Sequence, residues 1–146
     1  MKAAPFNYLR PASVTEACEA LADDADARVL AGGQTLVPML AMRLARPSLL
    51  VDITRLDEVG AIEDSGEGIA IGAAVRQAVA LRSDLIAREV PLLAAALPNV
   101  GHPPTRARGT VGGSVAHGDP SAEIALAATI LDARIVFLAD GEEEVI

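Results

Sequence analysis

Aromatic side chains are scarce in this chain: tryptophan is absent, and one tyrosine and two phenylalanines stand among 146 residues. Because 51% of the residues are still apolar, the core must be built from leucine, valine, isoleucine and alanine. A chain of this length forms one ordinary domain or two small lobes, which excludes a multidomain enzyme.

Cysteine and histidine are nearly absent as well. Cys18 is the one cysteine, and His102 and His117 are the two histidines. A single thiol excludes an internal disulfide, and three such side chains cannot complete a structural zinc site or hold an iron–sulfur cluster. We interpret Cys18 as a core residue on the apolar face of a helix, and we expect no metal ligands and no catalytic residues.

Positive charge is also limited, since Lys2 is the only lysine and 12 basic residues stand against 20 acidic ones, for a net charge of -8. A chain this acidic has no general attraction for nucleic acid or an anionic membrane. The apolar stretch over residues 29–42 contains glycine and proline and is too short to span a bilayer, and no signal-peptide run opens the chain. We expect a cytoplasmic location, no nucleic-acid partner and no membrane span.

The first of two expected lobes covers residues 1–56. Ser13 and Glu16 form a capping-box pattern ahead of an amphipathic helix. The expected elements are, in order, a helix over residues 13–22, a buried strand over 28–31, a helix over 35–44 and a strand over 48–53. The last three predict a βαβ unit with parallel strands and a right-handed crossover.

The second expected lobe covers residues 57–146 and is of mixed or antiparallel type, so the fold class is α+β. Its expected elements are a hairpin of residues 60–64 and 68–73, helices over 83–87 and 91–97, a loop over 99–108, a helix capped by Asp119 with Pro120 in its first turn, and a strand over 133–139 that turns at Asp140-Gly141. A returning strand has barely begun when the chain stops, so we expect a truncated fold.

A first glycine-rich segment lies between a strand and a helix, where glycines let the backbone approach a ligand and the helix start supplies free N–H groups. Its sequence is Ala31-Gly32-Gly33-Gln34-Thr35-Leu36. These groups suit a phosphate or pyrophosphate, although a Gly-Gly turn before a helix can equally be structural punctuation.

A second glycine-rich segment runs toward the expected helix start at Asp119. Its sequence is Arg108-Gly109-Thr110-Val111-Gly112-Gly113-Ser114-Val115-Ala116-His117-Gly118-Asp119-Pro120. A tight turn with a capping aspartate is the plain alternative. Two such segments in one acidic chain favour a dinucleotide held by backbone dipoles, although neither matches the Rossmann fingerprint or a Walker A loop.

Together the two segments resemble the FAD-binding segments of molybdenum hydroxylases, in the separate medium subunit of the aerobic carbon monoxide dehydrogenase and xanthine dehydrogenase family. The resemblance extends over essentially the whole chain, through Pro5-Phe6-Asn7-Tyr8, Leu49-Leu50-Val51-Asp52-Ile53 and Val100-Gly101-His102-Pro103. It implies an FAD-binding domain of the vanillyl-alcohol-oxidase/molybdopterin-dehydrogenase type.

The resemblance also implies which residues bind FAD. The first segment would wrap the pyrophosphate, Val100 and Gly101 would lie near the adenine, and the second segment would form a second clamp. Asp119 and Glu123 would reach ribose hydroxyls or orient the backbone. The full set is Val29, Leu30, Ala31, Gly32, Gly33, Gln34, Thr35, Leu36, Val100, Gly101, Thr110, Val111, Gly112, Gly113, Ser114, Asp119 and Glu123.

By the same resemblance, the chain would be an oxidoreductase subunit that passes electrons through FAD to an acceptor such as a quinone or oxygen. Its partners would be a molybdopterin-binding large subunit and a [2Fe–2S] small subunit. The sequence departs from the family where Pro104-Thr105-Arg106-Ala107 replaces Gln-Ile-Arg-Asn. It is also about half the family's length and lacks residues expected near the isoalloxazine ring.

Two other functions remain open on the sequence. A scaffold that keeps the fold without binding flavin is one, and a serine hydrolase is the other, because Ser114 lies near His117 and Asp119 in a partial nucleophile-elbow pattern. We interpret the histidines as hydrogen-bonded loop residues. The guanidinium groups of Arg106 and Arg108 could pair with phosphate or be solvated, and residues 142–144 form a solvated face.

Overall fold

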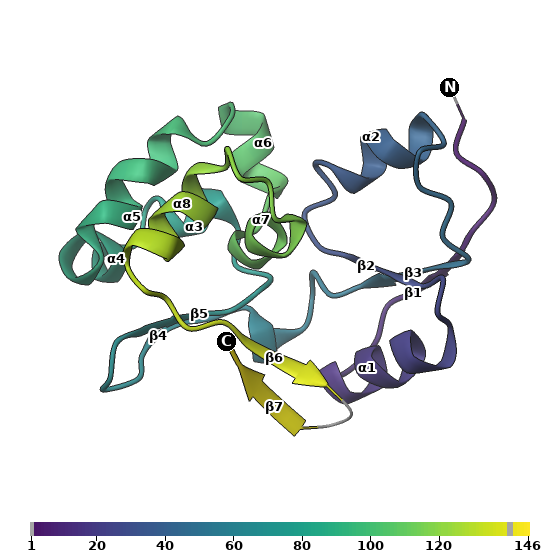
Figure 1. The fold of residues 1–146 in the computed structure, drawn as a ribbon, viewed down its shortest axis with the longest axis horizontal. Coiled ribbons are helices and arrows are strands. Elements are labelled where there is room, and N and C mark those ends of the chain that lie inside the picture. Colours follow the sequence, from purple (N-terminus) through teal and green to yellow (C-terminus); the bar gives the residue numbers. More distant parts are fainter. Residues whose placement is uncertain (1, 140–141) are drawn as a thin grey trace. The chain divides into compact units, whose positions relative to one another are not determined.

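A computed structural model describes residues 2–139 and 142–146 (Figure 1). The chain forms two compact units: the first contains the residues up to Leu56 together with Arg134–Ile146, and the second contains Asp57–Ala133. The second expected lobe includes residues 134–146, whereas the structure groups them with the first unit. Among the described residues, Val136–Ala139 pairs with Glu142–Val145 and with no other strand.

The first unit is built on a three-stranded parallel sheet of order β1-β3-β2. These strands are β1 (Asn7–Leu9), β2 (Arg28–Leu30) and β3 (Leu49–Asp52). The central strand β3 is buried, with Val51 at 0% exposure, as expected for a parallel strand flanked on both sides. The strand predicted over residues 28–31 is confirmed as β2, but its predicted burial is wrong, because β2 is an edge strand and Val29 is 43% exposed.

Helix α1 (Val14–Asp23) follows β1, and α2 (Leu36–Ala41) connects β2 to the parallel strand β3. The capping-box prediction for α1 is confirmed: Ser13 Oγ accepts a hydrogen bond from Glu16 N at 3.1 Å, and the Glu16 carboxylate accepts one from Ala12 N at 2.6 Å. Cys18 is half-buried rather than deep in the core. Helix α2 ends earlier than predicted, because Arg43 adopts the left-handed conformation at φ 58°.

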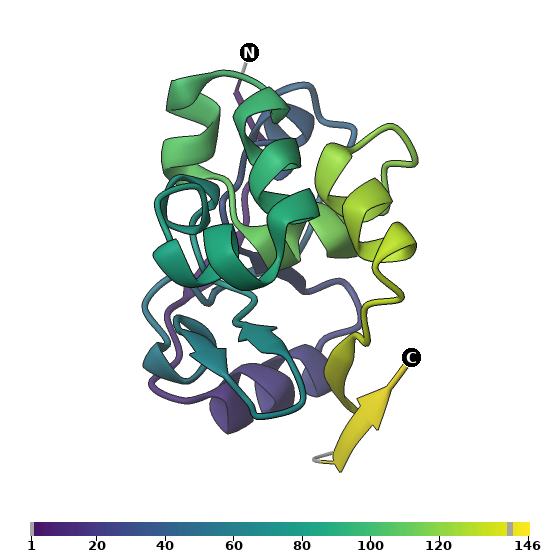
Figure 2. The same cartoon turned by 90° about the vertical axis from the view of Figure 1, so that its left-hand side faces the viewer.

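The second unit combines one antiparallel hairpin with a group of short helices (Figure 2). Its elements are a 3₁₀ turn at Asp57–Val59, β4 (Ile62–Asp64), β5 (Ile69–Ile71), α3 (Gln77–Ala80), α4 (Asp84–Glu89), α5 (Pro91–Ala96), a 3₁₀ turn at Leu97–Asn99, α6 (Pro103–Arg108), α7 (Val111–His117) and α8 (Glu123–Ile130). Its core is aliphatic, as the scarcity of aromatic residues requires. The fully buried side chains at its centre are Ile86, Leu97 and Ile124.

The predicted hairpin and the helices near residues 83–87 and 91–97 are confirmed. The loop predicted over residues 99–108 is wrong, because residues 103–108 form α6. His102 is its N-cap, and Pro103 and Pro104 stand in the first turn, where a helix needs no N–H donor from them. The prolines that indicated a loop therefore begin a helix.

The C-terminal hairpin pairs β6 (Val136–Ala139) with β7 (Glu142–Val145) in antiparallel register. The strand predicted over residues 133–139 is confirmed in its second half, and β7 is a fuller returning strand than we expected. The predicted turn at Asp140-Gly141 lies outside the described residues. Glu143 and Glu144 are exposed. In its fold class, the chain is α+β as predicted.

Candidate functional site

The first glycine segment follows β2 at the carboxyl end of the parallel sheet. Gly33 adopts φ 68°, a conformation that side-chain-bearing residues rarely take. Its carbonyl accepts a hydrogen bond from Val37 N at 2.9 Å, and a Cβ at this position would stand 3.0 Å from Val37 Cγ2. Gly33 is therefore required by the turn that directs the chain into α2.

Backbone donors are available in this segment. Gln34 and Thr35 are exposed, and within the described part of the chain their backbone N–H groups have no hydrogen-bond partner. Thr35 is the N-cap of α2 without a capping hydrogen bond from its side chain. The Gln34 side chain donates back to Gly32 O at 3.1 Å. The first turn of α2 thus presents free N–H groups to solvent, as an anion-binding segment requires.

The second glycine segment is mostly helical, although its glycines favour a turn or loop. Val111–His117 form α7, and Thr110 is its N-cap, with Oγ1 accepting a hydrogen bond from Gly113 N at 3.0 Å. Val111 N donates to Val75 O at 2.9 Å. Among the described residues, Gly112 N has no partner. This helix start again leaves a backbone donor for an anion.

Tight packing explains two glycines of the second segment. A Cβ on Gly112 would stand 2.5 Å from Ala73 Cα, and a Cβ on Gly109 would stand 2.7 Å from Gln77 Oε1. Glycine at these positions lets α7 begin directly against residues 73–77. Sequence reasoning assigned the glycines to ligand approach and did not identify Gln77, because a single amide in an apolar stretch gives no signal of its role.

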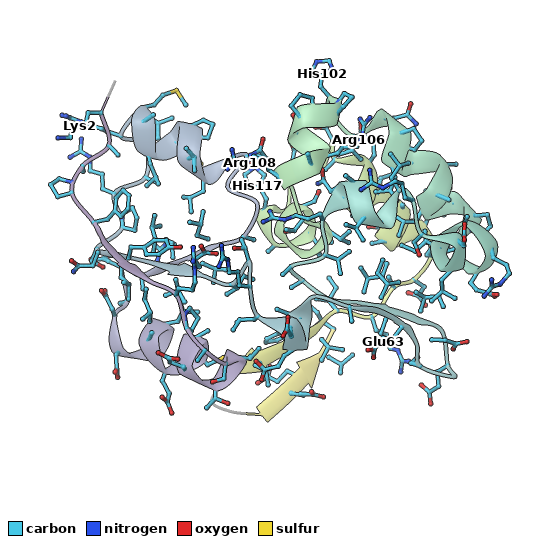
Figure 3. All side chains as sticks on the ribbon, turned by 180° about the vertical axis from the view of Figure 1, so that it is seen from behind. Lys2, Glu63, His102, Arg106, Arg108 and His117 are labelled. Atoms are coloured by element: carbon cyan, nitrogen blue, oxygen red, sulfur yellow. The ribbon has the colours of Figure 1, made fainter. Side chains whose placement is uncertain are left out.

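Val100 and Gly101 are held by Arg106 rather than left in an open loop. Arg106 Nη1 donates to the carbonyls of Pro98, Val100 and Gly101 at 3.2, 2.9 and 3.0 Å. Gly101 adopts φ 49° in this turn. Arg106 lies among the helices of the second unit (Figure 3). Arg106 is half-buried, and its Nη1 group is occupied by these carbonyls, while phosphate pairing through its other N–H groups stays a prediction.

Asp119 and Glu123 do not both lie at the start of a helix, although the sequence predicts that they do. Asp119 is not a helix N-cap, because α8 begins at Glu123 with Ala122 as its N-cap. The Asp119 carboxylate instead accepts hydrogen bonds from Ser121 N at 2.9 Å and Ser121 Oγ at 2.7 Å. These hydrogen bonds, led by that of the Ser121 side chain, lower the pKa of Asp119. Glu123 is the first residue of α8.

The histidines lie on exposed helix ends. His102 caps α6 and points away from it (Figure 3), and His117 is the last residue of α7. Ser114 lies inside α7 rather than on a strand-to-helix elbow, and no hydrogen bond joins it to His117 among the described residues. The geometry on which a serine hydrolase depends is therefore not formed. Arg108 is exposed, and its carbonyl accepts a hydrogen bond from Arg76.

Sequence reasoning missed a polar network at the carboxyl end of the parallel sheet. Asp52, 6% exposed, ends β3 and accepts hydrogen bonds from the Tyr8 hydroxyl, from Arg10 Nη2 at 3.3 Å and from Thr54 N at 2.9 Å. Burial opposes ionisation of Asp52, but the hydrogen bonds from Thr54, Tyr8 and Arg10 outweigh it and lower its pKa. The network joins β1 to β3.

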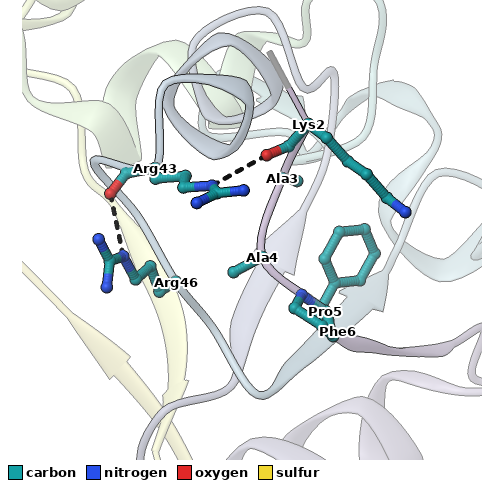
Figure 4. A pocket seen from close by; sticks show the side chains of 7 residues that line it. All are labelled: Lys2, Ala3, Ala4, Pro5, Phe6, Arg43 and Arg46. Carbon is teal, nitrogen blue, oxygen red and sulfur yellow. Dashed lines mark hydrogen bonds between the residues drawn. The ribbon is translucent and has the colours of Figure 1, made fainter.

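A basic hollow also lies in the first unit. It is lined by Lys2, Ala3, Ala4, Pro5, Phe6, Arg43 and Arg46 (Figure 4). Arg43 Nε donates to Lys2 O at 3.1 Å, and Arg46 Nε donates to Arg43 O at 3.3 Å. None of its residues belongs to the predicted FAD set.

Two features, a cluster of metal ligands and a membrane-spanning helix, are absent from residues 2–139 and 142–146. No group of three or more histidine, cysteine, aspartate or glutamate side chains there could hold a metal ion. In the same part of the chain, no helix has the length and apolar character that crossing a bilayer demands.

Two solved enzyme structures resemble this chain closely. Quinoline 2-oxidoreductase from Pseudomonas putida 86 matches with a TM-score of 0.97 and 39% identity, covering 100% of this chain and 51% of that one. Carbon monoxide dehydrogenase from Hydrogenophaga pseudoflava matches with a TM-score of 0.96 and 35% identity, with the same coverage. The fold of this chain therefore matches a domain that makes up about half of the matched chain in each of these enzymes.

The sequence comparisons name the family. The model of the FAD binding domain in molybdopterin dehydrogenase matches residues 4–146, and the chain belongs to this family. The nicotine 6-hydroxylase medium subunit of Paenarthrobacter nicotinovorans is 38% identical over 92% of this chain and 48% of its own length. The carbon monoxide dehydrogenase medium chain of Hydrogenophaga pseudoflava is 40% identical over 79% and 40%. The chain thus spans about half the length of these relatives.

Proposed function

We propose that this chain binds FAD as part of the flavoprotein subunit of a molybdenum-dependent dehydrogenase. The observation that carries the proposal is the family match over residues 4–146, which includes both glycine segments. The proposal extends to the whole set of predicted residues: eight of them, residues 29–36, lie in the first unit, and the others lie in the second.

The local structure fits a pyrophosphate. The turn at Gly33 frees the N–H groups of Gln34 and Thr35, and the start of α7 leaves Gly112 N free among the described residues. Backbone N–H groups at helix starts favour an anion without requiring lysine, which suits a chain with a net charge of -8. We propose that the two segments contact the same diphosphate linkage.

The other predicted residues would have supporting roles. Val100 and Gly101, fixed through their carbonyls by Arg106, would border the adenine. Asp119 and Glu123 carry carboxylates that repel phosphate, so they would serve ribose hydroxyls or orient backbone groups. When bound, FAD would supply the hydride and electron chemistry, while the chain binds and orients it.

In a complete enzyme, we propose that this chain's subunit receives electrons from a [2Fe–2S] subunit and passes them to an external acceptor. The second partner would be a large subunit that binds molybdopterin and the substrate. Relatives named as medium subunits or medium chains of nicotine 6-hydroxylase and carbon monoxide dehydrogenase support this arrangement. We place the assembly in the cytoplasm.

FAD binding by the chain is the first testable prediction. The purified chain is titrated with FAD and followed by flavin fluorescence and by absorbance after gel filtration. Gly113→Glu adds an anion to the first turn of α7 without lowering helix propensity, so it abolishes FAD retention while circular dichroism stays unchanged. Ala116→Glu adds the same charge at an exposed position of the same helix and retains FAD.

Two results would contradict parts of this account. Unchanged FAD occupancy in Gly113→Glu would remove the second segment from the site. A wild-type chain that is colourless after incubation with excess FAD and gel filtration would instead favour the scaffold that keeps the fold without binding flavin.

A further inference from the structure

We propose that Gln77 is a positioning residue, whose buried amide sets the first turn of α7 for the pyrophosphate of FAD. The inference rests on the proposed function, because it concerns the same ligand. Gln77 is 6% exposed and begins α3, at a distance in sequence from both glycine segments. Neither the family resemblance nor the sequence pattern assigns it a role.

The backbone of Gln77 is part of a short antiparallel bridge to the second glycine segment. Gln77 N donates to Gly109 O at 2.9 Å, Val111 N donates to Val75 O at 2.9 Å, and Arg76 pairs with Thr110 between them. The residues that lead into α7 are thus anchored on both sides of Thr110. The start of α7 is fixed by residues 75–77 rather than by helix propensity, which its glycines make poor.

The side chain of Gln77 adds a third contact at the same point. Gln77 Nε2 donates to Thr110 O at 3.3 Å. The reverse orientation of the amide would face two acceptor oxygens toward each other, so the hydrogen bond fixes which amide atom faces Thr110. Thr110 in turn caps Gly113 N at 3.0 Å. The Gln77 amide therefore acts on the residue that orients the proposed phosphate-binding turn.

Gly109 and Gln77 fit against each other without spare room. A Cβ on Gly109 would stand 2.7 Å from Gln77 Oε1, 3.0 Å from Cδ and 3.1 Å from Nε2. A side chain at position 109 would therefore collide with the Gln77 amide. Gly109 itself has φ -57°, which every residue can adopt, so its lack of a side chain reflects this contact and not its backbone conformation.

One polar atom of the Gln77 amide is unfavourable for the stability of the folded state. Its Oε1 is buried and has no hydrogen-bond partner among the described residues. A buried acceptor without a donor is unfavourable, and an apolar side chain of the same shape would avoid that penalty. We conclude that the amide at this position serves the placement of Thr110 rather than the stability of the core.

The test compares wild type with Gln77→Met, which keeps the shape and removes both polar atoms. Val79→Met, at an exposed position of the same helix, is the matched control. Three quantities are measured: the melting temperature, amide hydrogen exchange at Gly113 and Ser114, whose N–H groups donate to Thr110, and Kd values for FAD, ADP and adenosine. For Gln77→Met we expect an unchanged or higher melting temperature, about tenfold faster exchange and about tenfold weaker FAD and ADP binding, which corresponds to about 1.4 kcal/mol.

Adenosine binding separates positioning from a general structural role. Adenosine lacks the pyrophosphate, so its Kd is unchanged in Gln77→Met if the residue acts through the first turn of α7. Equal losses for adenosine and ADP would overturn the proposal. So would exchange rates and FAD affinity that match those of wild type, while the proposed function would then stand. A wild-type chain that binds no FAD would overturn both.

A second pair of variants tests the same contact if Gln77→Met fails to fold. Gly109→Ala alone pushes its Cβ into the Gln77 amide, and we expect weaker FAD binding. In a Gln77→Ala background, the added Cβ finds space, so Gly109→Ala causes no further loss of affinity. Additive losses in the double variant would show that the two residues do not act through one contact and would overturn the proposal.

Discussion

At the scale of single residues, Asp52 links two strands of the first unit through a charge. Its carboxylate is buried, and it pairs with Arg10 at 3.3 Å while also accepting hydrogen bonds from Tyr8 and Thr54. A buried carboxylate is tolerated when its oxygens are fully hydrogen-bonded. The network therefore ties β1 to the central strand at the edge where the first glycine segment emerges.

Replacement of Asp52 tests this link. Asp52→Asn keeps the shape but loses the charge that Arg10 and Tyr8 stabilise. We expect the free energy of unfolding at pH 7 to fall by about 1–3 kcal/mol, measured by urea denaturation. Asp26→Asn, at an exposed position of the same unit, is the control and leaves it nearly unchanged.

The pH dependence follows from the lowered pKa of Asp52. A carboxyl group whose pKa is lower in the folded state stabilises the fold above its unfolded pKa, and this contribution is lost as pH falls through the folded pKa. The difference between wild type and Asp52→Asn therefore narrows from pH 7 toward pH 2. A difference that stays constant over this range would contradict the assignment, because Asp24 and Asp119, whose pKa values are also lowered, are present in both proteins.

At the scale of elements, α7 shows how packing overrides local preference. Its sequence contains Gly112, Gly113 and Ser114, which favour a turn or loop. The helix forms because Thr110 caps it and because Gly112 fits against Ala73, where a Cβ would stand 2.5 Å from Ala73 Cα. The Thr110 cap is local, but the contact of Gly112 with Ala73 joins residues far apart in the sequence, so no local pattern could have revealed it.

The cap of α7 can be removed without changing its shape. Thr110→Val deletes the hydroxyl that accepts from Gly113 N, so we expect a loss of about 1 kcal/mol in stability, measured by thermal denaturation, and weaker FAD binding. Thr110→Ser retains the acceptor and most of the affinity. Ser13→Ala removes the equivalent cap of α1 and lowers stability without affecting FAD binding. Equal FAD affinity in Thr110→Val and wild type would contradict a role for this turn.

Other elements were predictable to different degrees. The capping box of α1 and the hairpin of β4 and β5 depend on neighbouring residues, and both were predicted correctly. Edge strand β2 was predicted as buried because its apolar sequence does not reveal that β1 and β2 both flank β3. Helix α6 was missed because Pro103 and Pro104 suit a helix start as well as a loop.

At the scale of the whole molecule, the sequence identified the family, while the FAD contacts remain a proposal. The two glycine segments, at their particular separation in the sequence, were sufficient to indicate the family. The proposed FAD contacts name residues of both units, whereas the sequence pattern predicts only the local structure within each unit. Gln77 and Arg106 donate hydrogen bonds to the carbonyls of the proposed site residues Thr110 and Val100, and only the structure reveals these contacts.

We propose that both glycine segments contact one FAD molecule. The most direct measurement is a titration of the isotope-labelled chain with FAD, followed by backbone amide NMR signals. We predict that the amides of Gly33, Gln34 and Thr35 and those of Gly112 and Gly113 shift together and saturate at the same FAD concentration. Shifts confined to one segment, or saturation of the two segments at different concentrations, would contradict the claim.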